Sequence, residues 1–133
     1  MLINYLNSPP GPFGPYSTVV WYRDLIFVSG QIPVDENGEV VGRTPGEQVE
    51  KALQQLYKAA GWPEEEVACL SIRVYAVNLE KAASDINQAY EKFHSYNQLP
   101  YPAREMVGVS ALPRGALVEV AGIFARKIYR EER

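Results

Sequence analysis

Apolar residues recur along the chain with two periods, which separate predicted strands from predicted helices. Within residues 70–77, Leu, Ile, Val and Ala occupy every second position, as expected for a strand with two different faces. Helical spacing occurs between residues 44 and 61 and again from 79 to 96. The apolar positions of these two segments are Val49, Ala52, Leu53, Leu56 and Ala60, followed by Ile86, Ala89, Tyr90 and Phe93.

The first helical segment also carries signals at both of its ends. Thr44 can cap its N-terminus, Pro45 suits the first helical position, and Glu47 completes a capping box. Gly61 can adopt the left-handed conformation that commonly ends a helix. We therefore expect the helix to begin at Pro45 and to end just before Gly61.

Strands are predicted before the first helix. Residues 18–22 and 25–29 are rich in β-branched and aromatic side chains, and the two residues between them can form the turn of a hairpin. A second turn at Asn37-Gly38 predicts a short strand around residues 40–41.

The two ends of the chain differ in character. Residues 8–17 are rich in Pro and Gly, which block helix and ladder hydrogen bonds, so we expect a lead-in without regular structure. Residues 103–110 and 116–125 read as the last two strands, joined by a Pro-Arg-Gly turn at 113–115.

This order of elements, β-β-(β)-α-β-α-β-β, predicts an α+β fold with two helices on one side of a mixed sheet. With 133 residues, 47% of them hydrophobic, the chain has the size of one domain, which we expect to span residues 1–133. The last predicted strand is apolar on both faces, although two helices can cover only one face of the sheet. Such an open apolar face is normally buried in an oligomer, so we expect a homo-oligomer whose sheets face inward.

Charge and composition narrow the possible partners. The net charge is -3 and the basic residues are scattered, which disfavours nucleic acid as a partner. The single Cys69 and the lack of a secretory signal predict a reducing, cytoplasmic setting. No apolar run approaches the roughly 20 residues that span a bilayer, so we expect a soluble protein without a membrane partner.

Several common catalytic arrangements are not indicated. His94 has no second ligand at metal spacing, which disfavours a zinc site, and we expect it to lie on the helix surface. Cys69 has no basic neighbours, and we expect a buried, inert thiol. The sequence contains no dinucleotide-binding glycine motif and no P-loop, so it does not imply a nucleotide cofactor.

Two ionisable residues stand out in mostly apolar or small surroundings. Arg104 and Glu119 lie at the inner ends of the last two predicted strands, which we take to be adjacent. A guanidinium presents a planar fork that fits a carboxylate. The two side chains therefore either form a structural ion pair or hold a small carboxylate ligand and a water molecule between them.

The combination of several short segments is more informative than any one residue. These segments are Gly14-Pro15-Tyr16-Ser17, Val28-Ser29-Gly30-Gln31-Ile32-Pro33, Asn87 with Tyr90, Pro102-Ala103-Arg104, and Leu112-Pro113-Arg114-Gly115-Ala116-Leu117-Val118-Glu119. Together they resemble the RidA (YjgF-type) family of reactive-intermediate deaminases. The resemblance covers essentially the whole chain in the right order.

The resemblance implies a chorismate-mutase-like fold, a homotrimer with a cleft between neighbouring subunits, and hydrolysis without a metal or cofactor. The substrates would be 2-enamine and 2-imine acids such as 2-aminoacrylate or 2-iminobutyrate, and the products 2-oxo acids and ammonia. By similarity, Arg104 would grip the substrate carboxylate and Glu119 would position the hydrolytic water. The other residues that match the cleft are Tyr16, Ser29, Gly30 and Asn87.

Two positions depart from the family pattern. Glu105 and Met106 follow Arg104 where many relatives carry a small hydroxyl residue and then Thr or Cys. Alternation places Met106, but not Glu105, on the face of Arg104, so we expect a more apolar cleft. A non-catalytic trimer that binds small carboxylates is the main alternative, and an RNA-cleaving translation inhibitor is a weaker one. A chorismate mutase would rest on the fold alone.

Overall fold

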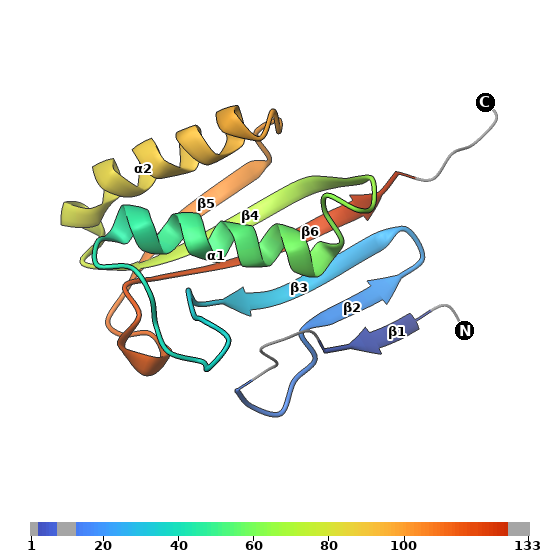
Figure 1. Ribbon diagram of the computed structural model, residues 1–133, viewed down its shortest axis with the longest axis horizontal. Coiled ribbons are helices and arrows are strands. Elements are labelled where there is room, and N and C mark those ends of the chain that lie inside the picture. The colour runs from blue at the N-terminus through green and yellow to red at the C-terminus, as the bar shows by residue number, and fades with distance from the viewer. Residues whose placement is uncertain (1–2, 8–12, 128–133) are drawn as a thin grey trace.

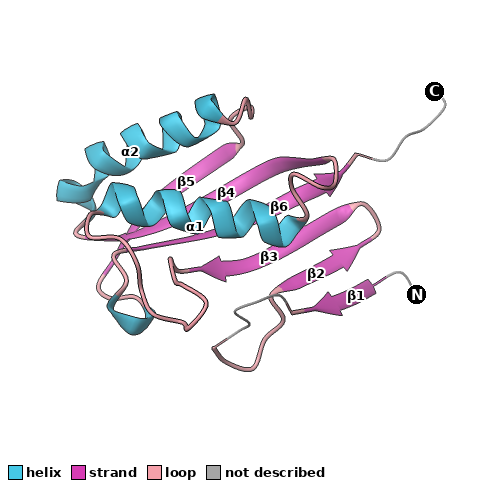
Figure 2. Cartoon of the chain, in the orientation of Figure 1, coloured by secondary structure: helices cyan, strands magenta, loops and turns pink. Residues whose placement is uncertain are grey.

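The computed structural model describes residues 3–7 and 13–127, which form one six-stranded sheet with two helices over one of its faces (Figures 1 and 2). The α+β architecture expected from the sequence is confirmed. The elements in chain order are β1 (Ile3–Leu6), β2 (Val19–Tyr22), β3 (Leu25–Gln31), α1 (Pro45–Ala60), β4 (Val67–Val77), α2 (Leu79–Tyr96), β5 (Ala103–Val109), the short 3-10 helix η1 (Pro113–Gly115) and β6 (Val118–Arg126).

The strand order in the sheet is β1-β2-β3-β6-β4-β5. All neighbours pair antiparallel except β4 and β5, which are parallel because α2 carries the chain back between them. The expectation that the last two strands are adjacent is therefore wrong, since β4 lies between β5 and β6. A hairpin between β5 and β6 would have made them antiparallel neighbours, but β4 occupies that position.

The strand β1 was not predicted, because its four residues lie before the Pro-rich segment and show little alternation. It pairs with β2 at one edge of the sheet. Residues 8–12 of the predicted lead-in fall outside the described residues, and residues 13–17 form no helix or strand. The strand expected around residues 40–41 is reduced to an isolated bridge between Val34 and Val40.

The ends of α1 follow the predicted signals closely. The Thr44 hydroxyl accepts a hydrogen bond from the Glu47 backbone N–H at 3.1 Å. The Glu47 carboxylate accepts in turn from the N–H of Arg43, one residue before the position that a capping box would use. Gly61 ends the helix with φ of 115°, a conformation that glycine adopts without strain.

The core lies between the helices and the sheet, with α1 over β3 and β6 and α2 over β4 and β5 (Figure 1). Its largest fully buried side chains come from both helices and from the sheet. Each helix thus buries one apolar stripe, as the spacing predicted. They include Ile26, Leu53, Leu56, Tyr57, Ile72, Ile86 and Phe124.

His94 is fully buried in this core, so the prediction of a helix-surface histidine is wrong. Its Nε2 lies 2.8 Å from the Tyr57 hydroxyl on α1, and its Nδ1 lies 2.8 Å from the Tyr90 carbonyl. Because the carbonyl can only accept, Nδ1 carries the proton and Nε2 accepts from the hydroxyl. Both ring nitrogens have a hydrogen-bond partner, so burial of the histidine leaves neither of them unpaired.

The opposite face of the sheet is left without a helix (Figure 2). Phe27 on β3 and Val107 on β5 point to this open face and are 40% and 43% exposed. Apolar side chains on an uncovered sheet face agree with the expectation of an oligomer, which stays a prediction. Neither helix in the described part of the chain has the length and hydropathy needed to cross a membrane.

Candidate active site

Arg104 lies on β5 and points to the helix-covered face. It is in register with the buried Ile72 of β4, and side chains in register share a face. Its guanidinium carbon lies 4.7 Å from the centre of the Tyr90 ring on α2. Arg104 forms no hydrogen bond or ion pair with any other residue that the structure describes, so its N–H donors are available to a ligand.

Asn87 lies on α2, three residues before Tyr90, and it is exposed. Residues three apart are neighbours on a helix surface, so Asn87 is connected to Arg104 only through Tyr90. Tyr90, which contacts Arg104, and its helix neighbour Asn87 are grouped with the arginine. We call this group the Arg104 half-site.

Glu119 lies on β6 and points to the open face. It is in register with Tyr75 of β4, whereas the next residue, Val120, is buried under the helices. Its carboxylate lies directly against Gly30, so closely that a Cβ atom at residue 30 would overlap it. Burial raises the pKa of the Glu119 carboxyl above its ordinary value.

Ser29 and Gly30 lie where the pairing of β3 with β6 shifts between Val28 and Gln31. This irregularity brings the glycine against Glu119. The Ser29 hydroxyl donates to the Ser17 carbonyl at 2.6 Å and so ties the end of the lead-in to β3. Ser29, Gly30 and Glu119 form a second group, which we call the Glu119 half-site.

Tyr16 is connected to the Glu119 half-site only through the chain. It is exposed, and its hydroxyl accepts a hydrogen bond from the backbone N–H of Phe13 at 3.3 Å. The neighbouring Ser17 makes the contact with Ser29 described above. Tyr16 therefore makes no direct hydrogen bond to Glu119, and its place in the site stays a prediction.

The two half-sites do not meet within one chain. Arg104 and Glu119 point to opposite faces of the sheet, and β4 separates their strands. The expectation that they share a pocket as neighbours on adjacent strands is therefore wrong for a single chain. The alternative of an Arg104–Glu119 ion pair is wrong for the same reason.

Glu105 and Met106 lie on opposite faces, as alternation predicted. Glu105 forms an exposed ion pair with Arg73 of β4, with 3.6 Å between Oε1 and Nε. Met106 is partly buried and packs against the core under α2, on the face of Arg104. The side chain that replaces the family's usual residue thus adds apolar surface beside the Arg104 half-site.

Cys69 is partly buried on β4 and packs against the core. Burial raises the pKa of its thiol to about 11, so the thiolate is scarce at neutral pH. This agrees with the prediction of an inert thiol.

Hollows mark the surface of the described residues, and two of them can be compared with the half-sites. One, of about 400 Å³, lies on the open face beside Ser29 and is lined by side chains of β2, β3, β4 and β6. The other, of about 790 Å³, lies between α1 and α2 and contains no member of either half-site. Of these two hollows, the first adjoins Ser29 of the Glu119 half-site.

Tyr90 is a direct neighbour of Arg104, a contact that was not predicted although both residues belong to the motifs. The signal was available, because Tyr90 follows Asn87 by one helical turn and both precede the strand that carries the arginine. Tyr101 was missed as well; its ring stacks on Tyr90 with 6.3 Å between centroids.

Known proteins are similar to this chain in sequence and in fold. Residues 6–126 match the family model described as Endoribonuclease L-PSP. A RutC family protein, y4sK of Sinorhizobium fredii, is 40% identical over 90% of this chain and 93% of its own length. The human 2-iminobutanoate/2-iminopropanoate deaminase is 31% identical over 86% of this chain and 82% of its own.

A solved structure agrees with both findings. E. coli TdcF, with bound serine, superposes with a TM-score of 0.77 and 29% identity, covering 96% of this chain and 99% of that one. The chain therefore belongs to the Endoribonuclease L-PSP family, which is the RidA (YjgF-type) family that the sequence motifs indicated. The expected fold class is confirmed by the same likeness.

Proposed function

We propose that this chain is a 2-iminobutanoate/2-iminopropanoate deaminase, which hydrolyses reactive 2-enamine and 2-imine acids to 2-oxo acids and ammonia. The active form would be a homotrimer with its sites between subunits, and it would use no cofactor. Family membership and the named activity of the human relative support this reaction class. The serine bound to TdcF adds that a relative holds a small molecule with a carboxylate.

The observation that carries the proposal is the pair of complementary half-sites on opposite faces. One offers a guanidinium without a protein acceptor, and the other offers a half-buried carboxylate with a raised pKa. The Arg104 half-site has no carboxylate to handle protons, and the Glu119 half-site has no guanidinium to bind a substrate carboxylate. Because β5 is an edge strand, a second copy whose β5 edge lies over the open face would bring the Arg104 half-site of one subunit to the Glu119 half-site of its neighbour.

In such a cleft, Arg104 would bind the substrate carboxylate through two parallel N–H donors. Lysine at this position would keep the charge but lose the fork. The 2-imine is already electrophilic at C2, so the protein needs no covalent nucleophile. Holding the imine carbon near an ordered water supplies much of the rate by proximity alone.

Glu119 would handle the protons. Water adds through its oxygen to C2 of the protonated imine, and Glu119 accepts the proton that the water loses. Glu119 then returns this proton to the nitrogen of the carbinolamine, and the C2–N bond breaks. The hydroxyl passes its proton back to Glu119 as the C2–O bond becomes the carbonyl, and Glu119 gives that proton to the departing ammonia, which leaves as ammonium. The raised pKa of Glu119 suits this double role, because it brings the carboxyl closer to the pH at which it works.

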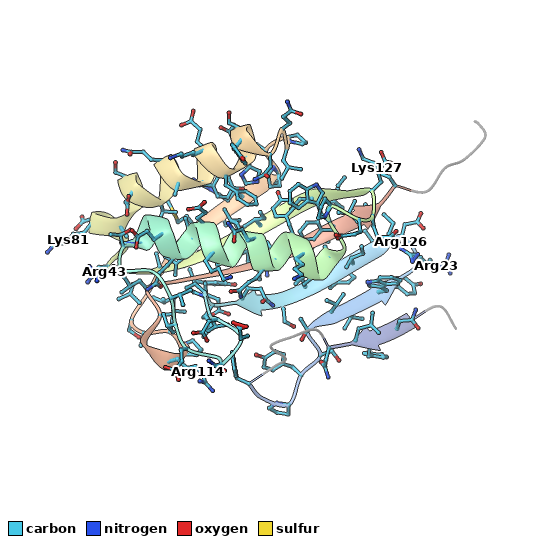
Figure 3. The ribbon with its side chains drawn as sticks, in the orientation of Figure 1. Arg23, Arg43, Lys81, Arg114, Arg126 and Lys127 are labelled. Atoms are coloured by element: carbon cyan, nitrogen blue, oxygen red, sulfur yellow. The ribbon has the colours of Figure 1, made fainter. Side chains whose placement is uncertain are left out.

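Two other activities compete with this proposal. A carboxylate-binding trimer would use Arg104 in the same way but would need no proton transfer by Glu119. RNA cleavage is less well supported, because the net charge is -3. The labelled cations in Figure 3 also gather at two separate ends of the molecule, with Arg23, Arg126 and Lys127 at one end and Arg43, Lys81 and Arg114 toward the other.

The test is ammonia release from 2-iminobutyrate that a pyridoxal-phosphate threonine dehydratase generates in the assay, with heat-killed protein as the control. We expect Arg104→Ala to abolish both turnover and binding of 2-oxobutyrate. Glu119→Gln should keep binding but lower kcat by about 10² or more, as expected for loss of a general acid–base. Arg43→Ala and Glu91→Gln, exposed positions outside both half-sites, are the matched controls. Wild-type turnover in both site variants would contradict the proposal, and binding without turnover in the wild type would favour the carboxylate-binding alternative.

A further inference from the structure

We propose that Tyr90 is the positioning residue for Arg104, with its ring serving as the platform on which the guanidinium rests while its N–H edge binds the substrate carboxylate. This inference rests on the role proposed above for Arg104. It concerns a residue that touches the arginine rather than the reacting atoms.

The contact between the two side chains leaves the donors of the arginine free. The guanidinium carbon lies 4.7 Å from the centre of the Tyr90 ring, within the range of an attractive cation–π contact. A guanidinium placed over a ring uses its face, whereas its N–H groups lie in its plane. Because no other described residue forms a hydrogen bond or ion pair with Arg104, the ring is what orients this exposed side chain.

The ring is itself held firmly. Tyr90 is 5% exposed, and its centroid lies 4.4 Å from that of His94. The His94 Nδ1–H donates to the Tyr90 carbonyl, and its Nε2 accepts from the Tyr57 hydroxyl. The ring also stacks on Tyr101, at an angle of 24°, and the centroid of Tyr101 lies 5.7 Å from that of His94. A chain of contacts from the core thus fixes the platform under an otherwise flexible arginine.

The charge state of His94 supports this arrangement. Burial lowers the pKa of His94, and the positive charge of Arg104 lowers it further. A neutral imidazole leaves the negative face of the Tyr90 ring to a single cation, Arg104. A protonated His94 would instead place a second positive charge beside the same ring.

The Tyr90 hydroxyl takes no part in the contact with Arg104. It is buried and has no hydrogen-bond partner among the described residues. Phenylalanine at this position therefore keeps the ring and removes only a group that gains nothing from burial. Leucine keeps apolar bulk but removes the π-face, so the two substitutions separate the platform from general packing.

The experiment measures the Kd of 2-oxobutyrate by calorimetry, together with KM and kcat for 2-iminobutyrate, in Tyr90→Phe and Tyr90→Leu. Tyr96→Leu, on the same helix and 85% exposed, is the matched control. We expect Tyr90→Leu to raise Kd and KM about fivefold, the factor that corresponds to ~1 kcal/mol of cation–π attraction, with kcat little changed. Tyr90→Phe and Tyr96→Leu should behave like the wild type.

A second measurement does not depend on activity. The Nε–H resonance of Arg104, assigned by its loss in Arg104→Lys, should be shifted upfield by the ring current in the wild type and in Tyr90→Phe, but not in Tyr90→Leu. An unmoved resonance in Tyr90→Leu overturns the inference, as does an equal loss of affinity in Tyr90→Phe. An active wild type with unchanged KM in Tyr90→Leu overturns the inference alone, whereas a wild type without binding or turnover overturns the proposed function as well.

Discussion

At the scale of single residues, the position of Glu119 depends on the absence of a side chain at Gly30. The Glu119 carboxylate lies against Gly30 of β3. It occupies the space that the Cβ atom of any other residue at this position would fill. The resemblance singled out both residues, but it did not say that one makes room for the other. That relation gives the glycine a role in setting the position of the carboxylate.

We therefore expect Gly30→Ala to lower kcat as far as Glu119→Gln does, by about 10². The added methyl group overlaps the carboxylate, so Glu119 or β3 must shift. Ammonia release from 2-iminobutyrate measures the effect, and the double variant Gly30→Ala/Glu119→Gln is the control. Because both changes act on one group, the double variant should be no slower than Glu119→Gln. Additive losses would show that Gly30 acts independently of the carboxylate.

The misplacement of His94 shows where residue-level reasoning failed. Histidine is intermediate in burial on average, and the prediction placed it on the surface without regard to helical spacing. His94 follows Tyr90 by four residues and Ile86 by eight, which places it on the buried stripe. Helical spacing alone would have predicted a buried His94, but the polar character of the side chain was given more weight.

At the scale of elements, the buried contact between His94 of α2 and Tyr57 of α1 makes the packing of the two helices sensitive to pH. The lowered pKa of His94 means that the native state holds it neutral, whereas the unfolded chain takes up a proton below about pH 6.5. The unfolded state then binds more protons than the native state. The free energy of unfolding should therefore fall as pH drops below about 6.5, by up to ~1.4 kcal/mol per pH unit.

Chemical denaturation between pH 5 and 8 measures this slope, and His94→Gln should flatten it. The attribution is direct because the chain contains one histidine. Glu119 has the opposite effect, since its raised pKa favours the native state as pH falls. The comparison is therefore made in the Glu119→Gln background. A slope that survives His94→Gln in that background would assign the pH dependence to another group.

The elements differ in how well local sequence determines them. The second helix begins and ends at the predicted residues, and α1 has its predicted cap, because capping and apolar spacing are local properties. The order of the strands is not local. Only the folded sheet shows that β4 separates β5 from β6. The same strand order separates the two half-sites. Candidate residues could thus be chosen from the sequence, but their arrangement in the sheet could not be predicted from it.

At the scale of the whole molecule, the open sheet face and the divided site have one explanation. A single chain leaves Phe27 and Val107 exposed on the same face to which Glu119 points. Covering that face with another copy would bury the apolar residues and complete the site together. Light scattering should then report three times the 14.9 kDa chain mass.

Mixing two inactive variants tests this division of the site most directly. If each site takes Arg104 from one subunit and Glu119 from its neighbour, an equal mixture of Arg104→Ala and Glu119→Gln chains, unfolded and refolded together, should recover about a quarter of wild-type ammonia release, because random assembly reunites both intact residues at that frequency. Each variant refolded alone should stay inactive. A mixture as inactive as its components would place both residues of a site in one chain. Within one chain, Arg104 and Glu119 point to opposite faces of the sheet, and β4 lies between their strands. An inactive mixture would therefore contradict the observed sheet as well as the mechanism.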